Sequence, residues 1–338
     1  MMKNKLLIGL FILSSHFTLY GKGITIKMAT LAPEGSPWHG LLLEMGQEWK
    51  VVTDGKVKLR IYPGGVAGDE RDVIRKIRIG QLHAAAATIE GLTEISKKMN
   101  VFYIPALVEN FKDLSYIRNK LEPFLIPEIE DRGFQFLSWA DVGWVYWFTK
   151  EPIVTPEDMK KLSLFVWSGD YYSLELYKKA GYHPVPLSAI DIMPSLQTGL
   201  IDAFSTTPLA ALSFQWFALA PYMLDFKWGP LIGALIISNK KWDEIPKEYH
   251  APMMEVVADF EKKIMGLIKQ DEAAINVMKE HGLTVTRLSP EEKQEWLDVT
   301  KTFYPKIRGS YVPEEIFDKA LEFKAELDSI KINTYPNR

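Results

Sequence analysis

The sequence predicts an α/β protein made of two lobes around a cleft, and three features support this. The chain has 338 residues, more than one hydrophobic core normally holds, because single cores stop growing at roughly 250–300 residues. Strand-like and helix-like segments alternate along it, which is typical of parallel sheets covered by helices. Neither an internal repeat nor a low-complexity linker divides the chain, so we expect several chain crossings between the lobes.

The N-terminus has the order of an export signal. A basic start with Lys3 and Lys5 precedes the apolar run Leu6 to Leu13, and a more polar stretch follows as far as Gly21. This order is typical of a cleavable secretory signal peptide, and the run is shorter than the roughly 20 residues a spanning helix needs. We expect residues 1–22 to be removed. The absence of Cys excludes anchoring through a lipidated cysteine.

The next residues predict a strand, a helix and a second strand. Residues 24–30 alternate apolar and polar side chains, as a strand does, and a loop at 31–37 ends the run. Ser36 is placed to cap the following helix, and residues 57–62 alternate again as a strand. Since parallel sheets bind ligands outside the carboxyl ends of their strands, we expect contacts in the loops at 31–37 and 63–69.

The alternation continues through the rest of the first half. A helix over 69–79 and a strand over 82–87 lead into Thr88 and Glu90, and a long strand-like stretch follows from Gln135 to Trp147. A second α/β unit then begins. Its predicted elements are a strand at 162–167, a helix at 170–180, a strand at 183–186, a helix at 188–198 and a strand at 200–205.

A long helix is predicted between Pro246 and His281. Apolar residues recur there at helical spacing with charges between them, and Gly266 is the one glycine in the run. A helix of that length would run about 50 Å at ~1.5 Å per residue. It is longer than one lobe, so we expect it to brace both.

Composition and motifs argue against catalysis and nucleic-acid binding. The formal net charge is -3, and no dense run of Lys or Arg could neutralise a row of phosphates. The His residues lack the spacing of a zinc-protease helix, and the nucleophile-elbow, phosphate-loop and dinucleotide motifs are missing. We therefore predict a non-enzymatic protein without catalytic residues, metal ligands or cofactor.

Several segments closely resemble the DctP family of TRAP-type solute receptors (tripartite ATP-independent periplasmic transporters). The similarity runs from about residue 24 to 325 and keeps the family's order and spacing. The segments that carry it are Tyr62 to Glu70, Ile77 to His83, Pro152 to Leu162, Lys179 to Pro186 and Leu196 to Asp202.

The resemblance implies the periplasmic solute-binding protein fold: two Rossmann-like lobes that close on a ligand, with a long helix spanning both. It also implies a periplasmic location and delivery of the ligand to the small and large membrane subunits of a TRAP-type transporter. We expect the first lobe to comprise residues 23–144 and about 229–265, and the second 145–228 and about 266–330.

Two departures from the family pattern change the expected ligand. The family's arginine for the ligand carboxylate falls on Phe165 in this sequence, and a second arginine position falls on Val145. A carboxylate enclosed without its cation loses about 3–5 kcal/mol. The sequence therefore predicts a hydrophobic, amphipathic or uncharged ligand in an aromatic cleft. The predicted ligand-binding residues are Leu31, Trp38, Thr88, Glu90, Trp144, Val145, Trp147, Phe165, Trp167, Tyr171, Phe204, Thr206 and Trp228.

Two alternatives remain open at this point. The protein could be an organic-acid receptor that uses a different cation, for example Arg71, Arg75 or Lys227, or a metal ion. It could also be an envelope interaction protein whose cleft has lost small-molecule binding.

Overall fold

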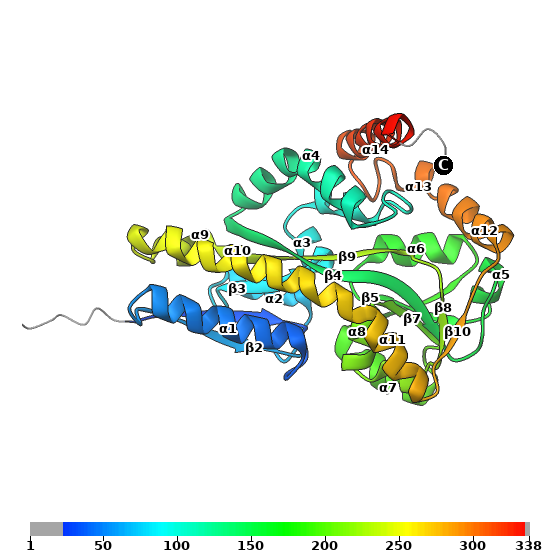
Figure 1. Ribbon diagram of the computed structural model, residues 1–338, viewed down its shortest axis with the longest axis horizontal. Helices are drawn as coiled ribbons and strands as arrows, with labels where there is room; N and C mark the ends of the chain where they lie inside the picture. The colour runs from blue at the N-terminus through cyan, green and yellow to red at the C-terminus, as the bar shows by residue number, and fades with distance from the viewer. Residues whose placement is uncertain (1–22, 335–338) are drawn as a thin grey trace, which may run out of the picture.

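The computed structural model describes residues 23–334, and a single sheet runs through both of its lobes (Figure 1). The main strand order is β2-β1-β3-β9-β4-β7-β5-β6. The predicted signal peptide, residues 1–22, lies outside the described part of the chain. The mixed α/β architecture with two lobes agrees with the sequence-based prediction.

The first lobe contains the predicted strand–helix–strand unit. Its parallel strands are β2 (Val57–Tyr62), β1 (Ile24–Thr30) and β3 (Ala84–Thr88). Ser36 caps α1 (Pro37–Val52) as predicted, because its hydroxyl accepts a hydrogen bond from His39 N at 3.4 Å. The other helical elements here are α2 (Glu70–Arg78), α3 (Ile89–Thr93), η1 (Lys97–Tyr103), α4 (Phe111–Glu130), α9 (Asn239–Asp243) and η4 (Lys247–Tyr249).

The second lobe repeats the α/β pattern. Its central strands are β7 (Ala203–Thr206), β5 (Ser163–Trp167) and β6 (His183–Leu187), with β8 (Tyr222–Leu224) and β10 (Thr284–Thr286) beside them. Strands β5, β6 and β7 lie within three residues of their predicted positions, whereas β8 and β10 were not predicted. The helical elements are α5 (Pro156–Met159), α6 (Tyr171–Lys179), η2 (Ala189–Asp191), α7 (Ile192–Thr198), α8 (Pro208–Ser213) and η3 (Trp216–Ala218).

Strand β4 (Phe134–Thr149) joins the two lobes. It pairs antiparallel with β9 (Gly229–Ser238) in the first lobe and with β7 in the second, where Tyr146 lies opposite Thr206. The same strand therefore contributes backbone hydrogen bonds to both lobes, as the expected chain crossings require.

The predicted long helix is present as a run of three segments. These are α10 (His250–Leu267), the 3-10 turn η5 (Ile268–Gln270) and α11 (Asp271–Glu280). Helix α10 packs on α1 and β4 of the first lobe, and α11 packs on α8 of the second, so the run braces both lobes (Figure 1). Within residues 23–334, no helix combines the length and apolarity needed to cross a bilayer.

The C-terminal segment fastens to both lobes. Helix α12 (Pro290–Lys301) belongs with the second lobe, because Trp296 Nε1 donates to the Val154 carbonyl at 2.8 Å. After α13 (Tyr304–Ile307), helix α14 (Glu314–Thr334) packs against α4, with Lys120 Nζ 2.9 Å from Glu326 Oε1. The expected division, which assigns about 266–330 to the second lobe, stays a prediction, and α14 also contacts α13 through Tyr304 and Phe317.

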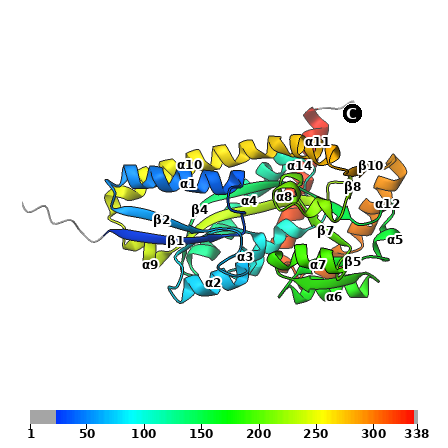
Figure 2. The same cartoon turned by 90° about the horizontal axis from the view of Figure 1, so that it is seen from below.

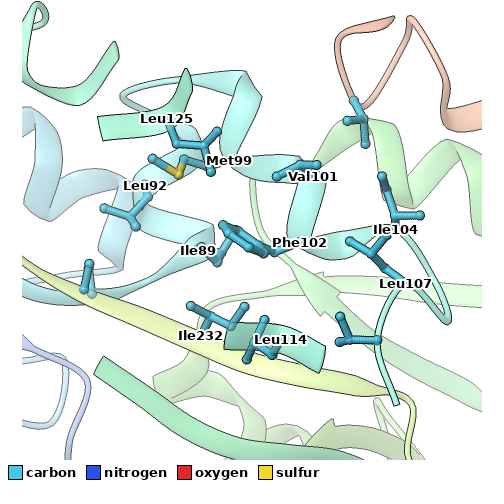
Figure 3. Close-up of a cluster of buried hydrophobic side chains, with 14 of the residues drawn as sticks. Ile89, Leu92, Met99, Val101, Phe102, Ile104, Leu107, Leu114, Leu125 and Ile232 are labelled. Carbon is cyan, nitrogen blue, oxygen red and sulfur yellow. The ribbon is translucent and has the colours of Figure 1, made fainter. Parts of the chain in front are cut away.

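A large apolar cluster holds the first lobe together on the side of α3, η1 and α4. Ile89 and Leu92 of α3 meet Phe102 of η1 and Ile232 of β9 there (Figure 3). Phe102 also contacts the edge of Trp139, with ring centroids 5.5 Å apart. None of these residues lines the cavity between the lobes that is described below.

The crossing strand bends at Gly143. Its pairing with β9 shifts register between Asp141 and Gly143, and Gly143 has φ 152. A Cβ atom at Gly143 would lie 2.8 Å from Oδ2 of Asp271, the first residue of α11. The Asp271 carboxylate accepts hydrogen bonds from Leu209 N, at 3.1 Å, and from Trp144 N. The bulge thus brings β4, α8 and α11 to one point between the lobes.

This arrangement predicts that Gly143→Ala destabilises the protein. The substitution forces an unfavourable φ and pushes a methyl group against the Asp271 carboxylate, at a cost of about 1–3 kcal/mol for each effect. Urea denaturation followed by circular dichroism measures the change in the free energy of unfolding.

Gly266→Ala is the matched control, because Gly266 lies in α10 with open space around its Cβ position. Alanine is the better helix former by roughly 0.5–1 kcal/mol, so this variant should be at least as stable as the natural protein. Equal stabilities of the two variants would contradict the role assigned to Gly143.

Candidate functional site

A cavity of about 920 Å³, counted to its open mouth, lies between the lobes. Residues at the carboxyl ends of β1 and β3 line it. Of the two loops expected to contact a ligand, 31–37 contributes to the lining and 63–69 does not. From the first lobe it is lined by Thr30, Leu31, Ala32, Pro33, Trp38, Leu42, Glu70, Ala86, Ala87, Thr88, Ala140, Val142, Leu231, Gly233, Phe260 and Ile264. From the second lobe it is lined by Phe165, Trp167, Ala189, Ile192, Ser205, Thr206, Ala210, Phe214 and Trp216.

The lining is strongly apolar. Among residues 23–334, the lining includes no Lys, Arg or His, and Glu70 is its one ionisable residue. The second lobe contributes an aromatic wall: Phe165 and Trp167 meet edge to face at 5.2 Å, and Phe214 stacks on Trp216 at 4.3 Å. Such surfaces favour apolar and planar groups over small hydrophilic ones.

Glu70 has little capacity left for a ligand. One carboxylate oxygen accepts from Thr88 N at 2.9 Å, and the other accepts from Thr88 Oγ1 at 2.6 Å and Gly91 N at 3.0 Å. These bonds tie the start of α2 to the end of β3 and to α3. Burial raises the pKa of Glu70 to about 7, since an ionised carboxylate loses its hydration there.

The raised pKa of Glu70 predicts a pH-dependent contribution to stability. Between its ordinary value of 4.5 and about 7, the folded protein binds more protons at Glu70 than the unfolded chain does. This contribution is present below pH 4.5 and is lost as the pH rises through the folded pKa. Differential scanning fluorimetry should therefore show the melting temperature of the natural protein, relative to Glu70→Gln, falling between about pH 5 and 8.

Glu34→Gln, at an exposed loop position, is the control and should show no such trend. A melting temperature of the natural protein that, relative to that of Glu70→Gln, stays constant or rises with pH would contradict the assignment.

Six of the predicted ligand-binding residues lie in the cavity lining: Leu31, Trp38, Thr88, Phe165, Trp167 and Thr206. They come from the ends of β1, β3, β5 and β7 and from the start of α1. Phe165, which stands where the family has its arginine, is only 5% exposed and faces the cavity. Contact of these residues with a ligand stays a prediction.

Three predicted tryptophans lie outside the lining. Trp144 packs on Phe111 of α4 at 5.4 Å between ring centroids, and Trp147 meets the edge of Trp228 at 5.9 Å. The bulge at Gly143 explains why Trp144 points away from the cavity. Strict alternation from Val142, which lines the cavity, would direct Trp144 into it, and one extra residue turns Trp144 to the opposite face.

The other four predicted residues also lie away from the cavity. Phe204 is fully buried and stacks on Phe148 at 5.3 Å, because it faces the core of the second lobe. Tyr171 begins α6 and is 76% exposed. Val145 is outside the lining and accepts a hydrogen bond at its carbonyl from Trp228 N at 2.9 Å. Glu90 is buried and forms an ion pair with Arg71.

None of the three alternative cations considered from the sequence lines the cavity. Arg71 NH2 lies 2.7 Å from Glu90 Oε1, and Arg75 pairs with Asp72 at 3.1 Å. Lys227 Nζ lies over the ring of Trp144, at 5.4 Å from its centroid. Arg71 and Arg75 are thus engaged by carboxylates, and Lys227 faces an aromatic ring.

Contacts between the lobes surround the cavity mouth. The Arg71 side chain of the first lobe lies so close to Gly169 of the second that a Cβ there would be 3.1 Å from Arg71 Cδ. The Asp69 carboxylate accepts a hydrogen bond from Ser188. The electrostatic contacts between lobes therefore lie at the rim, outside the apolar interior.

Sequence reasoning missed the deepest part of the lining. Leu42 of α1 and Phe260 and Ile264 of α10 border the cavity although they are at most 4% exposed. Their helical spacing predicts a buried face. The spacing does not show whether that face packs against other side chains or borders a cavity, so the sequence could not assign these residues to the lining.

A family model described as bacterial extracellular solute-binding protein, family 7, matches residues 28–309. The chain belongs to this DctP family of TRAP-type solute-binding proteins. The family serves solute transport. Among curated relatives, the C4-dicarboxylate-binding periplasmic protein DctP of Vibrio cholerae is 22% identical over 255 residues, covering 75% of this chain and 76% of the relative. DctP of Rhodobacter capsulatus is 21% identical over 251 residues, covering 73% and 75%.

Solved structures of DctP-family proteins show the same fold. The sugar acid binding protein of Advenella mimigardefordensis in complex with galactonate has a TM-score of 0.83 at 17% identity, covering 90% of this chain and 99% of its own. A TRAP periplasmic solute-binding protein of Shewanella oneidensis with bound succinate has a TM-score of 0.82 at 18% identity, covering 89% and 99%. The family and the two-lobed fold predicted from the sequence are confirmed.

Proposed function

We propose that this protein is a periplasmic receptor that captures a small, largely apolar solute between its lobes and delivers it to the membrane subunits of a TRAP-type transporter. The observation that carries the proposal is the cavity lining, which has no cationic side chain and whose single carboxylate, Glu70, already accepts three hydrogen bonds.

The energetics of burial favour an apolar ligand in this cavity. Apolar surface removed from water contributes roughly 25 cal/mol per Å², and the four aromatic rings of the second-lobe wall offer such surface. A carboxylate in the same place would lack a cation, at a cost of about 3–5 kcal/mol. The resemblance places Phe165 at the family's arginine position. A phenylalanine there adds apolar surface and removes a cation, so it favours an apolar ligand and disfavours a carboxylate.

An organic acid is the second candidate, and the comparisons favour it over an apolar ligand. The related structures were solved with succinate and galactonate, and the named relatives bind C4-dicarboxylates. In this protein such an acid would depend on hydroxyl groups such as those of Thr30 and Thr206, which line the cavity. Neutral hydrogen bonds contribute about half as much as charge-assisted ones, so we expect weak binding of acids.

A binding screen separates the two candidates. Native mass spectrometry of protein purified without detergent should show an apolar molecule retained in the cavity. Isothermal titration calorimetry should show at most weak binding of succinate and galactonate. Tight binding of either acid by a ligand-free protein would overturn the apolar assignment and support the organic-acid receptor. An empty cavity that binds neither class would favour an envelope interaction protein.

The substitution Phe165→Arg tests the specificity directly. It places a guanidinium in the lining beside Trp167, so we predict at least tenfold weaker binding of the retained apolar ligand and a measurable gain for carboxylates. A charge-assisted hydrogen bond of about 1.5–3 kcal/mol supports a gain of roughly tenfold to a hundredfold. Calorimetry with both ligand classes measures both changes.

Phe165→Leu is the control, because it keeps the position apolar and should retain the preference of the natural protein. Unchanged affinity of Phe165→Arg for both ligand classes would show that Phe165 does not contact the ligand.

A further inference from the structure

The cavity extends past the strand ends into the helical layer of the first lobe. Leu42 of α1 and Phe260 and Ile264 of α10 border it, and α1 and α10 pack side by side on the sheet (Figure 2). These three side chains are 2%, 3% and 4% exposed. The empty space therefore penetrates a region that is otherwise core.

Polar groups in the lining gather at the other end. Thr30, Thr88 and Thr206 stand at the carboxyl ends of β1, β3 and β7. Thr30 Oγ1 accepts from Ala32 N at 3.2 Å, which leaves its hydroxyl proton available to donate. The lining thus carries hydroxyl groups at the strand ends and apolar side chains where it meets α1 and α10.

Small side chains keep the space between the two ends open. Ala86 of β3, Ala140 of β4 and Ala210 of α8 lie along the lining, where larger residues would fill it. An apolar cavity of this kind takes up an apolar group rather than ordered water, because water needs two to four polar partners.

From this polarity gradient we infer that the ligand is an elongated amphiphile with an uncharged hydrogen-bonding head and a straight apolar tail. The head lies by the hydroxyls at the strand ends, and the tail runs towards α10. Phe260 and Ile264 form the end wall that limits the length of the tail. This inference rests on the proposed function and adds the ligand's shape, its orientation and the residues that select its length.

Titration with a series of alcohols tests the inference. Octanol, decanol and dodecanol are added to the full mature chain, and binding is followed by the fluorescence of the tryptophans, three of which line the cavity: Trp38, Trp167 and Trp216. Octanoate, decanoate and dodecanoate are titrated in parallel. We expect affinity to rise about fourfold per buried methylene group until the tail meets the end wall. Each alcohol should bind more tightly than the acid of equal length.

Two variants of the end wall should move the length preference in opposite directions. Ile264→Trp fills the deep end and should weaken binding of the longest alcohol that the natural protein binds well by about tenfold or more, while octanol binding changes little. Phe260→Ala enlarges the deep end and should shift the preference to longer tails.

Met253→Ala is the matched control, because Met253 is buried on the same helix and lies outside the lining. It should lower stability without moving the length preference. Thermal unfolding verifies that each variant is folded. Phe260→Leu, with a smaller change of volume, replaces Phe260→Ala if that variant does not fold, and Ile264→Phe replaces Ile264→Trp in the same way.

The outcomes distinguish the inference from the function on which it rests. If the natural protein binds none of the alcohols and retains no apolar molecule, the proposed function itself is overturned. If it binds them but the wall variants leave the length preference unchanged, or Met253→Ala shifts it equally, the end wall is refuted and the apolar receptor stands. Tighter binding of the acids than of the alcohols of equal length would contradict the inference that the head of the ligand is uncharged.

Discussion

The crossing strand β4 is the constraint on which the rest of the structure depends. It supplies backbone hydrogen bonds to β9 in one lobe and to β7 in the other, so neither lobe's sheet is complete without it. Its bulge at Gly143 lets Asp271 approach and join the start of α11 to α8. The position of the cavity follows from this junction, because Ala140 and Val142, just before the bulge, form part of the lining.

The distribution of charge around the cavity follows from the cost of burial. The pair of Arg71 and Glu90 lies outside the lining, next to Gly169 of the other lobe, where it can contribute to contacts between the lobes. Glu70 reaches the lining, but its hydrogen bonds to Thr88 and Gly91 compensate its burial in part. Aromatic and aliphatic side chains line the interior, because removing their apolar surface from water is favourable.

Much of the fold could be predicted because local signals and tertiary packing agree. Strands β1 and β2 and the cap of α1 at Ser36 were found at their predicted positions. Helix α4 was not predicted. It contains Pro123 and Pro127, which remove backbone donors and usually end a helix, and it persists because its apolar face is buried against the sheet. The predicted long helix is interrupted at η5, where it passes from one lobe to the other.

The sequence by itself determined the family and the two-lobed α/β fold, since these depend on motifs, spacing and residue identity. Only the tertiary structure decided which aromatic residues face the cavity. Phe165 and Trp167 do, whereas Trp144 and Phe204 do not. The physical reason is that an apolar side chain is stabilised equally by a packed core and by the wall of a cavity. A one-residue bulge in β4 is then enough to move Trp144 from the cavity wall to the packed core on the opposite face of the strand.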